Sequence, residues 1–157
     1  MKIPVYSSTI RRSEMDAVLT CMVEEKIGPG EMNQKLIKQV CEVFQTAGAA
    51  AFRSPAIALN YALKALNLEN GSSVIISSLA PSWQYVELNR QGYKPIVLDV
   101  EADSVFPSFE SIENAVQAGG RVLVLHETLG FLPDIEKILS LTIPVIEDIS
   151  QSAGAAY

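Results

Sequence analysis

The sequence predicts an α/β protein, a mostly parallel sheet in three layers with helices on both faces. From about residue 70 onward, short apolar runs alternate with segments of helical periodicity, an order typical of parallel sheets with crossover helices. The runs are continuously apolar, as strands buried on both faces are. Hydrophobic residues make up 48% of the 157 residues and charged residues only 19%, so the chain can fill such a core.

Two amphipathic helices are expected before the alternating region. The first spans 13–26 and the second spans 31–45, each with apolar residues at helical spacing. The glycines and proline at 28–30 break the chain between them. Each helix carries one cysteine, Cys21 or Cys41, and we expect both to pack as small core hydrophobes in a reducing compartment.

The remaining elements alternate. A short apolar strand is expected at 49–52. Ser54 is a preferred helix N-cap and Pro55 suits the first helical position, so a helix should run from there to about Asn67. Four further strands, separated by three helices, are expected at 74–76, 96–98, 122–125 and 144–146, with the helices at 81–90, 107–117 and 134–141. Since domains commonly span about 100–200 residues, residues 1–157 are predicted to form a single domain.

Composition excludes several classes of function. The chain has 12 basic and 18 acidic residues, a net charge of -6 and a pI near 4.8, which disfavours nucleic acid as a partner. There is no Cys-x-x-Cys pair and only one histidine, so no metal site is expected. Without an apolar run of signal-peptide or membrane-span length, the expected location is the cytoplasm, with no membrane partner. A mean hydropathy of +0.21 suggests that some apolar surface meets a partner.

Polar residues stand where the predicted strands end. Ligands of parallel sheets bind at this carboxyl edge, near the starts of the following helices. Any small-molecule site should therefore draw on Arg53-Ser54, Ser77-Ser78, Asp99, His126-Glu127 and Glu147-Asp148. There is no dinucleotide-binding glycine motif and no P-loop, so neither dinucleotide binding nor a P-loop NTPase function is supported by its usual motif.

Several of these residues allow two interpretations. Ser54 could cap its helix or help to bind an anion, and the cap is favoured because Pro55 lacks an N–H. Trp83 could stack on a flat ligand, although a lone tryptophan on a helix more often joins the core. His126 could act as an acid or base, or be merely hydrogen-bonded. Neighbours on a strand point to opposite faces, so Glu147 and Asp148 should not form a carboxylate pair; one could face a cleft or cap the next helix.

Four segments, in order along the chain, resemble one known family. The longest is 145–157, which reads V-I-E-D-I-S-Q-S-A-G-A-A-Y against a family pattern V-I-E-D-x-A-Q-x-x-G-A-x-Y. The others are 62–68, 92–100 (G-Y-K-P-I-V-L-D-V) and 130–134 (G-F-L-P-D). Together they resemble the N-terminal part of the DegT/DnrJ/StrS family of sugar aminotransferases, which are pyridoxal phosphate (PLP) enzymes of fold type I. The resemblance implies an incomplete fold type I large domain and a link to polysaccharide biosynthesis.

The resemblance implies a set of cofactor-binding residues. Asp148 matches the aspartate that pairs with the pyridine nitrogen of PLP, and Gln151 matches the glutamine near the ring hydroxyl. A carboxylate there keeps the ring nitrogen protonated, so that the ring can accept electrons. Ser54 and Ala56 match the phosphate turn, and Trp83 would replace the stacking aromatic after a local shift.

The sequence also departs from the family pattern. The phosphate turn S-G-T reads Ser54-Pro55-Ala56, which removes one N–H and one hydroxyl, so PLP is expected to bind weakly or not at all. Arg53 could compensate for part of that loss. The stacking aromatic position falls on Pro81, and the family's histidine position falls on Glu127. The family's Schiff-base lysine lies downstream of the 145–151 strand, and none of the seven lysines matches it, so no catalytic residue is assigned.

Three functional hypotheses follow. The first is an aminotransferase-like protein that is inactive on its own, a pseudoenzyme or assembly module. The second is one half of a split aminotransferase that another chain completes. The third is a parallel-sheet protein that binds a different anion. Because an unfinished sheet leaves an open edge strand, either a homodimer or a complementary chain is expected to cover that edge.

Overall fold

The computed structural model describes residues 7–155. The chain divides into two compact units, Met1–Ala51 and Phe52–Tyr157, and each is described by itself. The single domain expected over residues 1–157 stays a prediction. The last two residues of the family-like segment, Ala156 and Tyr157, lie outside the described part.

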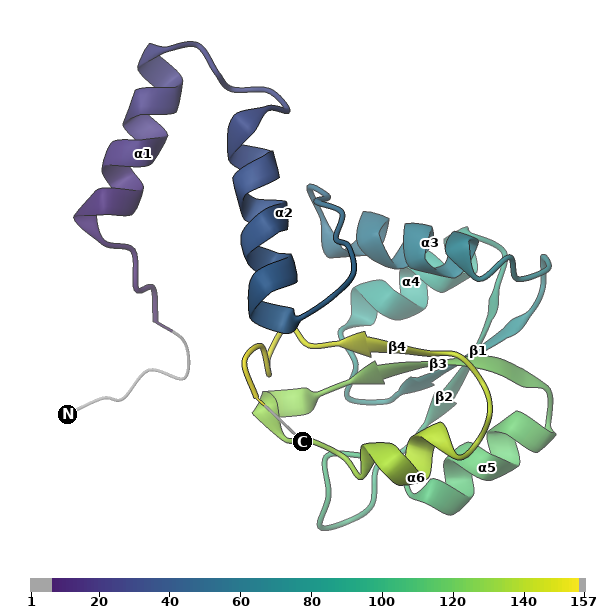
Figure 1. Cartoon of the computed structure of the whole chain (residues 1–157). Coiled ribbons are helices and arrows are strands. Elements are labelled where there is room, and N and C mark those ends of the chain that lie inside the picture. The colour runs from purple at the N-terminus through teal and green to yellow at the C-terminus, as the bar shows by residue number, and fades with distance from the viewer. Residues whose placement is uncertain (1–6, 156–157) are drawn as a thin grey trace. The chain divides into compact units, whose positions relative to one another are not determined.

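The first unit contains two helices, α1 (Arg12–Val23) and α2 (Glu31–Phe44) (Figure 1). α1 ends three residues earlier than expected, because the acidic side chains of Glu24 and Glu25 oppose the negative end of the helix dipole and Glu25 takes a φ of 57°. Neither helix contains a buried residue. Both cysteines are half-buried free thiols, so the prediction that they are core residues was wrong. Two helices alone provide no third surface to enclose them.

The second unit is a three-layer α/β structure (Figure 1). Its four described strands are all parallel, in the order β2-β1-β3-β4, which confirms the predicted fold class. The strands are β1 (Ser73–Ser77), β2 (Lys94–Leu98), β3 (Gly120–His126) and β4 (Val145–Asp148). The helices are α3 (Pro55–Ala65), α4 (Ser82–Arg90), α5 (Phe109–Gln117) and α6 (Ile135–Leu139), and a 3-10 turn, η1, spans Thr128–Gly130.

Some predicted elements differ from the structure. The strand expected at 49–52 was wrong, since these residues form irregular chain. Alanine has low strand propensity, and three of the four residues are alanines. α5 begins two residues later than expected because Ser108 is its N-cap and accepts a hydrogen bond from the Ser111 N–H at 3.0 Å. α6 is two residues shorter at its C-terminal end than predicted, and Thr142 beyond it takes a φ of 56°.

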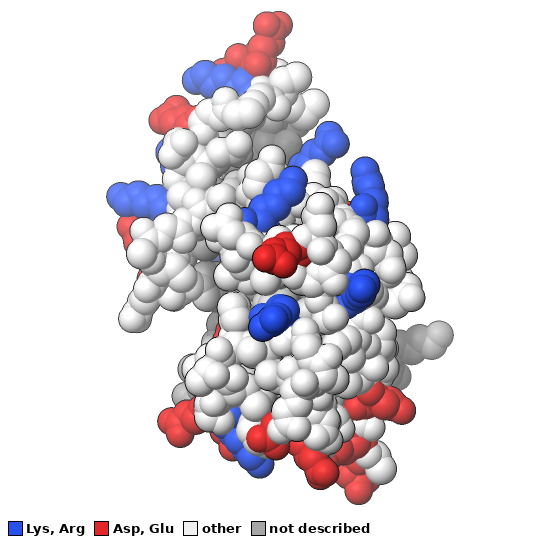
Figure 2. Space-filling model, turned by 90° about the vertical axis from the view of Figure 1, so that its right-hand side faces the viewer, with Lys and Arg blue, Asp and Glu red and all other residues white. Residues whose placement is uncertain are grey.

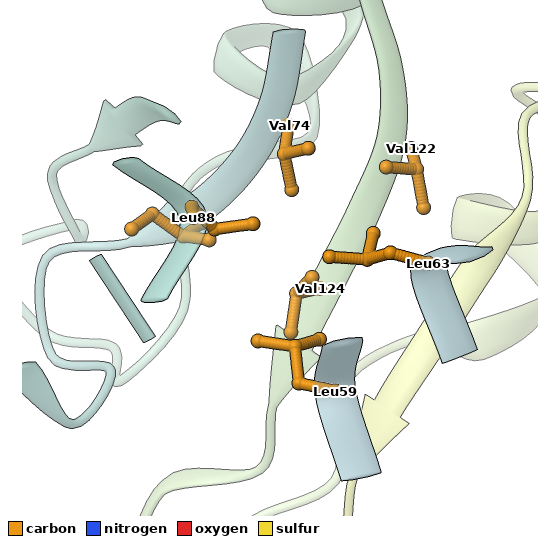
Figure 3. Packing of buried hydrophobic residues seen from close by; sticks show 7 residues of the cluster. Leu59, Leu63, Val74, Leu88, Val122 and Val124 are labelled. Atoms are coloured by element: carbon orange, nitrogen blue, oxygen red, sulfur yellow. The ribbon is translucent and has the colours of Figure 1, made fainter. Parts of the chain in front are cut away.

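The sheet has a hydrophobic cluster on each face. On one face, Leu59 and Leu63 of α3 and Leu88 of α4 point toward the sheet valines (Figure 3). Those valines are Val74, Val122 and Val124. On the other face, the sheet residues Ile75, Leu123 and Leu125 pack in one cluster with Ile112, Ala115 and Ile138 of α5 and α6. Burial on both faces explains why the strands read as continuous apolar runs.

A close contact at the start of β3 gives a test of this packing. A Cβ atom on Gly120 would lie 2.6 Å from Ile75 Cδ1 and 2.9 Å from the Ala115 carbonyl oxygen. We therefore expect Gly120→Ala to lower the free energy of unfolding by about 1–3 kcal/mol through overpacking. Chemical denaturation measures this. Gly48→Ala is the control, because a Cβ there meets nothing within 4 Å; equal effects of the two substitutions would contradict the packing argument.

The outer strands and the surface complete the description. Within the described residues, β2 pairs only with β1, and β4 pairs only with β3. No helix in residues 7–155 is long and apolar enough to cross a membrane. Figure 2 shows separate basic side chains spread over the surface in view, without a continuous basic patch, and several acidic side chains gathered toward its lower end.

Candidate cofactor site

The carboxyl edge of the sheet gathers polar side chains on the α3 and α4 face. The register pairs His126 of β3 with Asp148 of β4. Val122 and Val124, two and four residues before His126, belong to the cluster under α3 and α4. Since alternate strand residues share a face, His126 and Asp148 lie on that same face. They stand at the carboxyl ends of their strands, where ligands of parallel sheets usually bind.

Asp148 is held by three donors. Its Oδ2 accepts from Gln84 Nε2 at 2.7 Å and from His126 Nδ1 at 3.0 Å, and its Oδ1 accepts from the Ser150 N–H at 3.2 Å. An ionised carboxylate can only accept, so Nδ1 of His126 carries the proton. Gln84 and His126 are almost fully buried, at 0% and 2% exposure. The carboxylate is therefore fixed in position by the protein itself.

Gln84 is the site residue that sequence reasoning missed. It lies four residues before the core residue Leu88 on α4, so both side chains share the buried face of the helix. A polar residue at a core position was the signal that could have found it. Its Nε2 is used by Asp148, while its Oε1 is buried with no hydrogen-bond partner among the described residues. Leaving such an acceptor unsatisfied costs about 1–3 kcal/mol.

The opposite face of the same edge carries other carboxylates. Glu147 pairs in register with Leu125, which belongs to the cluster under α5 and α6, so it faces away from Asp148, as predicted. Buried Glu127 accepts a hydrogen bond from Ser152 Oγ. Desolvation, and then the negative charge of Glu127, raise the pKa of Glu147 above its ordinary value of 4.5.

The raised pKa of Glu147 predicts a pH-dependent effect on stability. Because folding favours its protonated form, ionised Glu147 destabilises the fold at neutral pH, and this cost disappears as the pH falls below 4.5. Glu147→Gln should therefore stabilise the protein at neutral pH, by about 0.5 kcal/mol or less since the side chain is exposed to solvent. Thermal unfolding above and below pH 4.5 measures it, with Glu101→Gln as the control. A gain that persists in acid would contradict this assignment.

Gln151 holds the turn that follows β3. Its Oε1 accepts from the Leu129 N–H at 2.6 Å. Leu129 takes a φ of 56°, an unfavourable conformation for a leucine that needs such support. Next to it, Gly130 has a φ of 83°, and a Cβ there would lie 3.2 Å from the Gln151 carbonyl oxygen. The role of Gln151 beside a ring hydroxyl stays a prediction.

The start of α3 offers few donors to an anion. Ser54 Oγ accepts from the Ile57 N–H at 3.3 Å, which confirms that Ser54 is a helix cap. Pro55 has no N–H. Of the first three helical positions, only Ala56 therefore keeps an N–H without a partner among the described groups. Arg53, the nearest cation in sequence, is exposed.

Trp83 and Pro81 at the start of α4 have local structural roles. Trp83 is half-buried and packs against the cluster under α3 and α4, which agrees with the core interpretation. Pro81 is the N-cap of α4. The part of the chain that the structure describes contains no group of acidic, histidine or cysteine residues that could hold a metal ion. Cofactor contacts of Ser54, Ala56, Trp83, Asp148 and Gln151 stay predictions.

The second unit is thus a parallel α/β sheet with a fixed aspartate at its carboxyl edge. A model of the DegT/DnrJ/EryC1/StrS aminotransferase family matches residues 8–157, and the chain belongs to this family. The resemblance read from the sequence is thereby confirmed.

Solved structures show the same fold. The GDP-4-keto-6-deoxy-D-mannose-3-dehydratase of E. coli, solved with bound hydrated PLP, has a TM-score of 0.90 and 22% identity, and the match covers 99% of this chain and 43% of that one. The aminotransferase from Psychrobacter cryohalolentis has a TM-score of 0.87 and 24% identity over 97% and 40%. DesV of S. venezuelae has a TM-score of 0.82 and 22% identity over 93% and 41%. The chain thus has the fold of part of a fold type I enzyme and spans about two-fifths of these structures' length.

PLP is the family's cofactor, and the hydrogen-bonding groups of the candidate site can be compared with what its ring and its phosphate need. Asp148 Oδ1 accepts one hydrogen bond in the structure, and a carboxylate oxygen can accept two, so a lone pair remains for a pyridine N–H. For the phosphate of PLP, the first three positions of α3 offer a single free N–H, on Ala56, and no threonine hydroxyl. Asp148 thus keeps an acceptor for a pyridine N–H, while the start of α3 has fewer donors than the family's phosphate turn.

Proposed function

We propose that this chain is a sugar-aminotransferase-like protein that binds PLP weakly or not at all and is catalytically inactive on its own. The start of α3 is the observation that carries the proposal. Pro55 and Ala56 remove a donor N–H and a hydroxyl, and Ser54 Oγ already accepts from the Ile57 N–H. Each lost hydrogen bond to a charged phosphate costs about 1.5–3 kcal/mol of binding.

The lysines of the chain support the same proposal. Lys64 lies over the Tyr61 ring and Lys137 lies over the Phe109 ring. Lys94 begins β2, at the amino end of the sheet and opposite the candidate site. Lysine is absent from the described hydrogen-bond partners of Asp148. Among the described residues of the second unit, these observations supply no amine at the site to which a PLP aldehyde could be attached.

The test is a titration of the purified chain with PLP, followed by absorbance, together with an assay of amino transfer from glutamate to a keto-sugar nucleotide. We expect weak or no PLP binding and no transfer. Transfer by the chain alone would refute the proposed function, as would a PLP affinity typical of working aminotransferases.

One half of a split aminotransferase is the second candidate. The outer edge of β4 has no strand neighbour among the described residues, and the chain covers only 40–43% of the three matched structures above. In this case a complementary chain would add strands to that edge and supply the lysine. Borohydride reduction in the presence of that chain and PLP should then leave a covalent adduct. Absence of the adduct would refute the split enzyme and favour a homodimer or an assembly module. A cytoplasmic location and a role in polysaccharide biosynthesis stay predictions.

A further inference from the structure

The two ends of the candidate site differ in hydrogen-bonding character. At the ring end, Asp148 Oδ1 has a free lone pair, and Gln84 Oε1 is a second acceptor without a partner among the described residues. Gln84 Oε1 belongs to the same amide that donates to Asp148 Oδ2, and its side chain is fully buried. At the other end, Ala56 provides the one uncommitted N–H in the first three positions of α3.

This distribution favours one kind of ligand. A fixed carboxylate and an amide oxygen both require donors, and a buried acceptor without a donor is costly. A protonated ring nitrogen supplies a charge-assisted donor to Asp148. A phosphate group has only acceptors at neutral pH. It would lose hydration at the start of α3 and regain little, because Pro55 has no N–H and Ser54 Oγ caps the helix.

We infer that this site has changed its ligand preference, and that it binds an unphosphorylated pyridine of the vitamin B6 type, protonated on the ring nitrogen, in preference to the phosphate ester. The inference rests on the proposed function, because it requires that the phosphate end of the site has lost its role. Asp148 selects the protonated nitrogen, and buried Gln84 holds the carboxylate in position.

Three probes test the inference on the unmodified full chain by isothermal titration calorimetry. Pyridoxine carries the ring nitrogen and no phosphate, pyridoxine 5′-phosphate adds the phosphate, and 3-hydroxybenzyl alcohol lacks the ring nitrogen. We expect pyridoxine to bind at least about tenfold more tightly than either of the other two, the factor that corresponds to one hydrogen bond to a charged group. Equal or tighter binding of the phosphate ester would overturn the inference, as would equal binding of the benzyl alcohol or no binding of pyridoxine.

Two variants separate the ring end from nonspecific effects. Asp148→Asn keeps an oxygen for Gln84 and His126 but removes the negative charge, so pyridoxine binding should weaken by about tenfold or more. Glu110→Gln is the control, because exposed Glu110 lies on α5, which packs on the opposite face of the sheet, and it should leave pyridoxine binding unchanged. Loss of binding in both variants, or in neither, would count against the assignment.

The experiment distinguishes this inference from the proposed function. Amino transfer by the chain alone would refute the proposed function, whichever probe binds. Absence of transfer together with preference for pyridoxine 5′-phosphate would leave the chain inactive and overturn only the inferred ligand preference.

Discussion

Replacing Pro55 with glycine and Ala56 with threonine is expected to tighten PLP binding by roughly a hundredfold or more. Glycine at position 55 restores a backbone N–H at the start of α3, and threonine at 56 restores a hydroxyl. Each adds a hydrogen bond to a dianionic phosphate, worth about 1.5–3 kcal/mol. Helix N-termini favour anions for the same reason. Absorbance titration with PLP measures the change.

The matched control is Pro55→Gly with Ala56→Val. Valine has the branched shape of threonine without its hydroxyl, so this double variant should recover only the part of the affinity that comes from the N–H. Glycine at the first helical position also loosens α3, which circular dichroism monitors. If both double variants bind PLP as weakly as the original chain, the missing N–H and hydroxyl at the start of α3 are not the cause of weak phosphate binding.

Asp148→Ala is expected to lower the free energy of unfolding by about 2–5 kcal/mol in the absence of any cofactor. The substitution removes the acceptor of two buried donors, Gln84 Nε2 and His126 Nδ1. Each unsatisfied buried donor costs about 1–3 kcal/mol. Urea denaturation of the ligand-free protein measures the effect. His126 is also the single histidine, so its NMR signal reports the loss of its partner directly.

Asp99→Ala is the control for this substitution. Asp99 likewise follows a strand and accepts two hydrogen bonds, from Ser78 Oγ at 3.1 Å and from the Val100 N–H at 2.9 Å, but both bonds are exposed. Water can replace an exposed acceptor, so the cost should stay below about 1 kcal/mol. Similar decreases in the free energy of unfolding for Asp148→Ala and Asp99→Ala would show that burial of Gln84 and His126 does not decide the effect.

The strands and most helices could be predicted from the sequence because their signals are local. Continuous apolar runs marked β1 to β4, and Ser54-Pro55 marked the start of α3. The prediction of a strand at 49–52 was wrong because a short apolar run does not show whether a neighbouring strand will pair with it. The prediction that the cysteines are core residues was wrong for a related reason. Helical periodicity shows which face of a helix is apolar, but it does not show what covers that face.

The candidate site was predictable only in part. Asp148 could be placed at the carboxyl edge from strand order, and its separation from Glu147 follows from strand alternation. Its partner Gln84 lies 64 residues away in sequence, and no local pattern connects the two. The shortage of donors at the start of α3 was predictable, because proline has no N–H and alanine has no hydroxyl.

The network around Asp148 also bears on how such a protein changes over generations. Because two buried neighbours need this carboxylate as an acceptor, mutants that lose it should fold poorly even where no reaction depends on it. Purifying selection on foldability alone would then retain the aspartate long after turnover had ceased. Its presence in a sequence of this kind therefore diagnoses an intact scaffold, and a working catalyst has to be inferred from other positions.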